Sequence, residues 1–506
     1  MENKISTSSL PFQERLGGVL LPVFSLPSLF GIGDFGPGAF QFLKIIRDLG
    51  LRYWHILPLT PTDTGRGNSP YSSSSAFALN SLFISPEAML QEQLAQPGDF
   101  LKTPRFSREK IDYVRITAWK RAFLLKTWER NRRSKILREE ISVFKKKHSF
   151  WLENYTRFSC LKKKNGNLSW NRWNLPTEKG HFLAADLEED MAFESYVQYL
   201  LFHQWQQVHE YAKELGVMIL GDLPFYVDYD SADVWSYQEL FRLNQEGAPQ
   251  VVGGVPPDYY SKTGQRWGNP IYNWDFMAKR EYTWWIERVR HALDMCDALR
   301  LDHFRGFSAY WEIEASCPNA VKGEWKPSPG QDLFEHMQKA LGNLPFFAED
   351  LGVITQDVHD LRTTWKFPGM KVLHFAFEDY ANNAYALHNH DSSSVVFTAT
   401  HDNNTSKGWF LEDLSSCQRK EIAEICGYPV GEGNVHRALV EMALDSVAHT
   451  AIVPLQDILG LGSSSRINIP ATASGNWAWR LSREDLFLLP SEAAWFSKKL
   501  SWSGRC

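Results

Sequence analysis

The stretch Ala298-Leu-Arg-Leu-Asp302 is a short apolar run that ends in a carboxylate, and runs of this kind decide the fold. Apolar runs of about five to seven residues are typical of buried parallel strands. Most of them follow a stretch with helical periodicity, which is the alternation expected of an α/β fold. Eight such runs occur, at residues 18–24, 53–59, 217–222, 298–302, 345–349, 371–377, 395–400 and 451–455. Eight strands with intervening helices favour a closed (β/α)8 TIM-type barrel over an open doubly wound sheet.

The chain between the second and third runs is far longer than an ordinary connection between a strand and a helix. Within it, residues 116–150 are strongly charged in a helical pattern, which favours a solvated helical face over a nucleic-acid-binding arm. We therefore predict three parts. Residues 1–60 form the first part of the barrel, residues 61–200 form a mostly helical insertion at the barrel mouth, and residues 201–506 form the remainder. Further loop insertions are expected at the C-terminal face.

The bulk composition argues against several classes of partner. A net charge of −5 and a pI near 6.3 give no electrostatic reason to bind nucleic acid or an anionic membrane. The six cysteines include no Cys-x-x-Cys pair, and the sequence has neither a secretory leader nor a long apolar span. We therefore predict a cytoplasmic protein. The 20 Trp and 18 Tyr residues suit stacking on sugars, although tryptophan also fills large cores.

Four of the runs end in, or just before, a carboxylate. In a barrel the active site forms at the C-terminal ends of the strands, so Asp222, Asp302, Glu349 and Asp402 are expected to share one mouth. A single acid in such a place is more often a solvent contact or a helix N-cap, but four together favour a functional site. Glycoside hydrolysis and glycosyl transfer both need a pair of carboxylates, one ionised and one protonated.

Asp302 and Glu349 fit this division of roles. Arg300 lies two residues before Asp302 and therefore projects to the same side of its strand, where it would keep Asp302 ionised. Crowding by the other acids would raise the pKa of Glu349 towards the value that a general acid needs. The sequence thus predicts a nucleophilic carboxylate at residue 302 and an acid/base carboxylate at residue 349.

The remaining polar groups near these runs suggest sugar contacts rather than a cofactor. Asp402 would stay ionised or hydrogen-bonded to sugar hydroxyls, and His303 and His401 are candidate ligands for the same hydroxyls. Residues 31–36 have G-x-G-x-x-G spacing but do not directly follow a strand, which argues against a dinucleotide loop. The His-Asn-His-Asp cluster at residues 388–391 lacks the spacing of a metal site. We expect no cofactor and no metal.

At these residues the chain resembles the amylomaltases, the 4-α-glucanotransferases related to the α-amylase barrel enzymes. The resemblance runs through most of the chain and rests on long motifs in the family's order: Gly31-Ile-Gly-Asp-Phe-Gly36, Ile56-Leu-Pro-Leu59, Ser69-Pro-Tyr71, Ser75-Ala-Phe77, Gly221-Asp-Leu-Pro224, Asp230-Ser-Ala-Asp-Val-Trp235, Gly254-Val-Pro-Pro-Asp-Tyr-Tyr-Ser261, Gly264-Gln-Arg-Trp-Gly-Asn-Pro270, Arg300-Leu-Asp-His-Phe-Arg-Gly-Phe307, Ala348-Glu-Asp-Leu-Gly352 and Thr400-His-Asp-Asn-Asn404. It implies that Asp302 is the nucleophile, Glu349 the general acid/base and Asp402 the stabiliser of the transition state.

The resemblance also implies a set of substrate contacts. Tyr71 would stack beside the subsite that holds the reacting glucose, and residues 254–261 would form a flexible loop that covers the cleft. Arg300, His401 and Asp222 would be the polar groups that support the carboxylates. Together with His303, the expected substrate-binding residues are Tyr71, Asp222, Asp258, Tyr259, Tyr260, Gln265, Trp267, Arg300 and His401.

The family's reaction is disproportionation, so the implied partners are maltooligosaccharides and α-1,4-glucans, as donor and as acceptor. The residues alone do not separate a transferase from a retaining hydrolase, because both form the same glycosyl-enzyme. A covering aromatic loop would exclude water and favour transfer. The alternatives are an α-amylase-type hydrolase and a catalytically inactive glucan-binding protein. The chain departs from the family's usual pattern at Asn68, Ser72 and residues 466–471, where we expect differences in subsite preference rather than in reaction class.

Overall fold

A computed structural model describes residues 11–173, 184–257, 261–352, 354–472 and 474–506. Its centre is a parallel sheet of eight strands in the order β10-β11-β12-β1-β2-β3-β6-β9. A further parallel bridge from Ala348 to Gly369, the residue before β10, joins the two ends of this sheet. The predicted (β/α)8 barrel is therefore confirmed. The strands are β1 (Leu16–Leu20), β2 (Tyr53–His55), β3 (Met218–Leu223), β6 (Ala298–Leu301), β9 (Phe346–Ala348), β10 (Met370–Val372), β11 (Val395–Phe397) and β12 (Thr450–Pro454).

Several strands end before the apolar runs that predicted them. The first run was expected at residues 18–24, but β1 ends at Leu20, and Pro22, which lacks an N–H, precedes a 3-10 helix at Val23–Ser25. The sixth run was expected at residues 371–377, but after β10 the chain turns into a 3-10 helix at Leu373–Phe375. Most of these residues stay buried after the strand has ended. Burial, rather than strand geometry, therefore explains the length of the runs.

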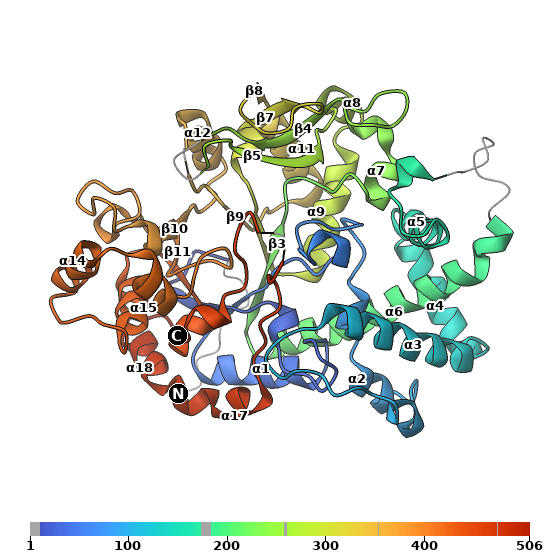
Figure 1. The fold of residues 1–506 in the computed structure, drawn as a ribbon, viewed down its shortest axis with the longest axis horizontal. Helices are drawn as coiled ribbons and strands as arrows, with labels where there is room; N and C mark the ends of the chain where they lie inside the picture. Colours follow the sequence, from blue (N-terminus) through green and yellow to red (C-terminus); the bar gives the residue numbers. More distant parts are fainter. Residues whose placement is uncertain (1–10, 174–183, 258–260, 353, 473) are drawn as a thin grey trace.

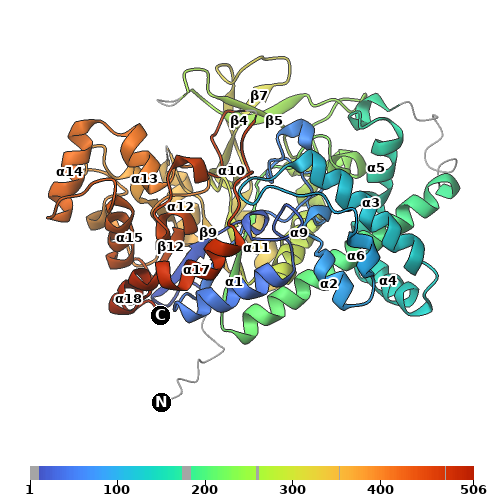
Figure 2. The same ribbon diagram turned by 60° about the horizontal axis from the view of Figure 1, so that its bottom comes forward.

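Helices surround the parallel strands, and Figures 1 and 2 show them around the outside of the barrel. The first of them, α1, buries Ala39, Phe42, Leu43 and Ile46, as its periodicity predicts, and Gly50 follows it with φ +91°. None of the helices in the described ranges is long and apolar enough to cross a membrane. Outside the long connection between β2 and β3 the helices are α1 (Pro37–Asp48), α7 (Ala232–Ser236), α8 (Trp274–Lys279), α9 (Thr283–Met295), α10 (Arg305–Ser308), α11 (Gly330–Leu341), α12 (Gln356–Thr364), α13 (Ser406–Gly408), α14 (Ser416–Cys426), α15 (Val435–Asp445), α16 (Leu455–Ile458), α17 (Arg483–Glu492) and α18 (Ala494–Trp502).

The connection between β2 and β3 is helical and lies on one flank of the molecule (Figure 1). The charged stretch at residues 116–150 forms most of α3 and α4, which bury apolar residues such as Phe123, Leu137 and Ile141 while most of their charged residues face solvent. The division of the chain at residues 60 and 200 stays a prediction. Residue 200 lies inside the last of these helices, which is continuous there. The helices are α2 (Pro86–Gln91), α3 (Tyr113–Asn131), α4 (Lys135–Lys147), α5 (Leu152–Lys164) and α6 (Ala184–Glu214).

A second, antiparallel sheet lies at one end of the molecule in both views (Figures 1 and 2). Its order is β5-β4-β7-β8, formed by Gln265–Pro270, Val251–Val255, Ala309–Glu314 and Glu324–Pro327. The sequence suggested only loop insertions here. Residues 254 and 255, expected in a covering loop, are the end of β4, whose partner strand β7 lies about 60 residues away in the sequence. Pairing over such a separation leaves little trace in local periodicity.

Candidate active site

The site is built on the two-residue period of the barrel strands. Inward-facing Tyr53, Leu220, Ala298, Phe347 and Phe397 pack in one apolar cluster inside the barrel. Two residues further along a strand the side chain returns to the same face. Two positions after Tyr53, Leu220, Ala298 and Phe347 stand, in the same order, His55, Asp222, Arg300 and Glu349. An apolar plug inside the barrel thus supports a polar layer at its C-terminal mouth.

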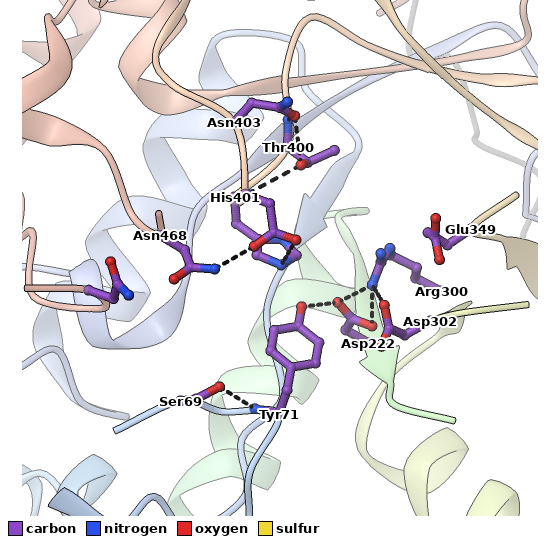
Figure 3. Close-up of polar contacts among 12 residues, drawn as sticks. Ser69, Tyr71, Asp222, Arg300, Asp302, Glu349, Thr400, His401, Asn403 and Asn468 are labelled. Carbon is purple, nitrogen blue, oxygen red and sulfur yellow. Dashed lines mark hydrogen bonds and ion pairs between the residues drawn. The ribbon is translucent and has the colours of Figure 1, made fainter. Parts of the chain in front are cut away.

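Arg300 links two of the carboxylates (Figure 3). Its Nη1 atom lies 2.9 Å from both carboxylate oxygens of Asp222 and 2.9 Å from Oδ1 of Asp302. The arginine is 4% exposed, while the side chain of Asp302 is 27% exposed. A buried cation therefore holds Asp302 beside it and leaves this carboxylate open to a ligand in the mouth.

Glu349 follows β9 and lies close to Arg300 (Figure 3). Its carboxylate accepts hydrogen bonds from the backbone N–H groups of His303, at 2.8 Å, and Leu351, at 3.2 Å. Burial raises the pKa of Glu349 to about 8, and the charge of Asp302 adds to this against the opposing effect of Arg300. The sequence attributed the rise to crowding by acids, but burial is the larger cause. Glu349 is thus mainly protonated at neutral pH.

Asp402 reaches the mouth from the loop after β11. Its Oδ1 accepts a 2.6 Å hydrogen bond from Nδ2 of Asn468, and its backbone carbonyl accepts one from Arg466. Nε2 of His401 lies 3.4 Å from Oδ2, and the Asp402 side chain is 46% exposed. Sequence reasoning missed Asn468 as a functional residue, although it flagged the segment 466–471 as unusual. The amide therefore fixes the direction in which this exposed carboxylate points.

Replacing Asn468 with Ala is expected to lower kcat/KM for a maltooligosaccharide roughly tenfold, the value of one charge-assisted hydrogen bond. The loss should fall on kcat, because Asp402 would still be present but would point in more than one direction. Initial rates measured beside those of Asn382→Ala, an exposed amide that hydrogen-bonds to its neighbour Asp379, check this. Equal rates for the two variants would mean that Asn468 does not position Asp402.

Tyr71 joins Asp222 to His401 (Figure 3). Its hydroxyl donates to Oδ2 of Asp222 at 2.7 Å, and its ring is stacked on His401 with centroids 5.2 Å apart and planes 15° apart. The ring of Trp477 packs against both, at 6.0 Å and 5.9 Å. No motif in the sequence pointed to Trp477. Three aromatic rings from distant segments thus form one wall beside the carboxylates.

The antiparallel sheet also contributes a residue beside the carboxylates. Trp267 of β5 is 39% exposed and meets the ring of His303 edge-on, with centroids 4.8 Å apart. Its indole N–H donates to Oε1 of Gln265 at 3.1 Å. Burial lowers the pKa of His303 to about 4, so the histidine is neutral. The other expected contacts, Asp258, Tyr259 and Tyr260, lie outside the described residues.

The chemistry available in this mouth is that of carboxylates, hydroxyls and aromatic rings. Within the described part of the chain, no group of three or more His, Cys, Asp or Glu side chains is arranged to hold a metal ion. An open carboxylate held by a buried cation, beside a protonated carboxylate, suits attack on an anomeric carbon with proton donation to the leaving oxygen.

Comparisons with known proteins agree with this chemistry. The sequence profile of the 4-alpha-glucanotransferase family matches residues 21–485. A 4-alpha-glucanotransferase of Thermus thermophilus is 43% identical over 483 residues, covering 92% of this chain and 95% of the relative. A chloroplastic/amyloplastic 4-alpha-glucanotransferase of Solanum tuberosum is 40% identical over 490 residues, covering 94% of this chain and 84% of the relative.

Solved structures give the same result. The amylomaltase from Streptococcus agalactiae, solved in complex with acarbose, has a TM-score of 0.93 and 33% identity, covering 97% of this chain and 100% of that structure. An amylomaltase from Corynebacterium glutamicum has a TM-score of 0.78 at 18% identity, covering 96% of this chain and 75% of that structure, and supports the fold alone. The family match extends over most of the chain, and this protein is therefore an enzyme of the 4-alpha-glucanotransferase family.

Proposed function

We propose that the protein is an amylomaltase, a disproportionating enzyme that transfers α-1,4-glucan segments between maltooligosaccharides through a covalent intermediate on Asp302. The observation that carries this proposal is the arrangement around Arg300. One buried guanidinium holds the open carboxylate of Asp302, while the neighbouring Glu349 has a pKa raised to about 8. A retaining double displacement needs this pair of an ionised nucleophile and a protonated acid.

In the first step, Oδ of Asp302 attacks the anomeric carbon of the donor glucan. The bond from that carbon to the glycosidic oxygen breaks, and Glu349 gives its proton to the departing oxygen. The non-reducing part of the donor stays as an ester on Asp302, and the shortened glucan leaves with a new hydroxyl. Arg300 is well suited to keep Asp302 ionised until it attacks, because the two groups are 2.9 Å apart.

In the second step, Glu349 has to act as a base, and the local charges favour this change. The negative charge of Asp302 helps to raise the pKa of Glu349. Esterification removes that charge, so the pKa of Glu349 falls in the intermediate. Glu349 is then ionised and takes the proton from the 4-hydroxyl of an acceptor glucan as its oxygen attacks the anomeric carbon. The new glycosidic bond forms, and Asp302 is released as a carboxylate.

The polar groups around the pair suit stabilisation of the transition state. Asp402, held by Asn468, offers an exposed carboxylate to sugar hydroxyls and to the positive charge that develops on the ring. Tyr71 and Trp267 offer aromatic faces on two sides of the mouth for stacking on glucose units. Acarbose bound to the amylomaltase of Streptococcus agalactiae supports a glucan-like ligand for this mouth too.

The pH dependence of the reaction should follow Glu349. The first step needs this group protonated, so kcat/KM is expected to fall tenfold per pH unit as the pH rises above about 8. Rates on maltotriose across the alkaline range measure this fall in kcat/KM. A maltosyl fluoride donor is the control, because fluoride leaves without a proton and the first step should then show no such fall. A fall that persists with the fluoride donor would show that another group titrates.

Transfer, rather than hydrolysis, is favoured by the antiparallel sheet at the mouth. Trp267 from this sheet contacts His303, directly after Asp302, and such a cover limits the access of water to the ester. The predicted contacts Asp258, Tyr259 and Tyr260 would extend this cover. Sugar acceptors would then compete well against water for the intermediate.

The test of the function is incubation with maltotriose alone, followed by chromatography. Transfer is expected to give glucose together with a ladder of longer oligosaccharides. Shortening of the substrate without a ladder would instead support an α-amylase-type hydrolase. Unchanged maltotriose that still binds to the protein would support a glucan-binding protein without activity.

A further inference from the structure

His55, the last residue of β2, lies beneath the carboxylates inside the barrel. It is 1% exposed, and its ring meets the rings of Phe347 and Phe397 edge-on, with both centroid distances at 5.8 Å. Phe347, on β9, lies two residues before Glu349. His55 pairs in register with Leu220, which lies two residues before Asp222. The imidazole thus belongs to the layer that directly supports the catalytic groups.

The polar atoms of this layer do not satisfy one another. Neither ring nitrogen of His55 hydrogen-bonds to any described residue, and the same is true of Nε of Arg300. Buried polar atoms are almost always paired, because an unpaired one loses its solvation without compensation. Nη1 of the same Arg300, by contrast, contacts both Asp222 and Asp302. A partner that pairs Nε of Arg300 with one nitrogen of His55 is therefore to be expected inside the barrel.

The charge state of His55 limits what that partner can be. Burial lowers the pKa of His55 well below its ordinary value, and the nearby Arg300 and His401 lower it further. The imidazole is therefore neutral and has one donor and one acceptor nitrogen. Arg300 Nε is a donor only. A single water molecule fits both, because it can accept from the guanidinium and donate to the imidazole.

We propose that His55 is a positioning residue, which holds Arg300 through one bound water and so fixes the direction in which the guanidinium presents Nη1 to Asp302. The inference rests on the proposed function of Asp302 as nucleophile. It gives His55, which lies in the layer below the carboxylates, a role beyond packing. The guanidinium is planar, so a hydrogen bond from Nε on one side restricts the rotation that would move Nη1 on the other side.

The two variants that test this are His55→Phe and His55→Gln. Phenylalanine keeps an aromatic ring against Phe347 and Phe397 but has no nitrogen, whereas glutamine keeps a donor and an acceptor. For His55→Phe we expect kcat on maltotriose to fall roughly tenfold with KM little changed. His55→Gln should recover most of the rate.

A purely structural role for His55 predicts a different pattern. Removal of an unpaired buried imidazole would then leave kcat of His55→Phe at the wild-type value, and this result would overturn the proposal. The wild-type protein in the same assay distinguishes a failure of the proposed function from a failure of the role proposed for His55. If it makes no ladder from maltotriose, the proposed function fails; if it does and His55→Phe matches it, only the role of His55 fails.

A measurement on the unaltered protein covers the case in which His55→Phe does not fold. A high-resolution crystal structure of the wild type is expected to contain a water within hydrogen-bonding distance of both Arg300 Nε and one His55 nitrogen. Direct contact of either group with another protein atom, or no water between them, would overturn the proposal without reference to activity.

Discussion

Asp302→Asn is expected to abolish transfer, with kcat on maltotriose reduced on the order of 10⁴-fold or more. An amide oxygen is a poor nucleophile, and it carries no charge to stabilise the positive charge that develops at the anomeric carbon. The fold should survive, because asparagine has nearly the same shape and Arg300 keeps its two contacts with Asp222. Initial rates and thermal unfolding of the same preparation measure both effects.

The matched control for this variant is Asp360→Asn, at an exposed position on α12. It makes the same chemical change far from the mouth and should keep the wild-type rate. If Asp302→Asn retained more than roughly a tenth of the wild-type kcat, the assignment of the nucleophile would be wrong. A pure glucan-binding protein would bind maltotriose equally well in both variants and convert it in neither.

Glu349→Gln should separate the two steps of the reaction. Glutamine donates no useful proton, so kcat on maltotriose is expected to fall about 10³-fold, within the range for loss of a general acid. A maltosyl fluoride donor does not need that proton and should still react with Asp302. The second step lacks its base, so the ester should accumulate and be found on Asp302 by mass spectrometry of peptides.

Two comparisons make the Glu349→Gln experiment decisive. Glu335→Gln, exposed on α11, should turn over without an accumulated adduct, as the wild type does. Glu349→Gln combined with Asp302→Asn should form no adduct at all. An adduct on another carboxylate, such as Asp402, would reverse the roles proposed here. The absence of any adduct with an otherwise folded protein would count against a covalent intermediate.

The local pattern of the chain was sufficient to predict the barrel and the place of its carboxylates. Runs such as 298–302 and 345–349 are apolar because both faces of a barrel strand are buried, and they end in an acid because the barrel opens there. The two-residue period also predicted that Arg300 and Asp302 share one face, and Nη1 of Arg300 lies 2.9 Å from Oδ1 of Asp302. Strand ends were less well predicted, since buried loops after β1 and β10 continue the apolar runs.

Only the tertiary structure decided which distant side chains meet at the mouth. The hydrogen bond from Asn468 to Asp402, the stack of Tyr71 on His401 and the contact of Trp267 with His303 all join segments that are distant in the sequence. The position of His55, level with Leu220 and one layer below Asp222, likewise depends on how β2 is placed in the closed barrel. Periodicity records whether a residue faces inward, because burial acts on each residue separately. It does not record which inward residues meet, because that is set by barrel closure and by loops that pair across long stretches of sequence.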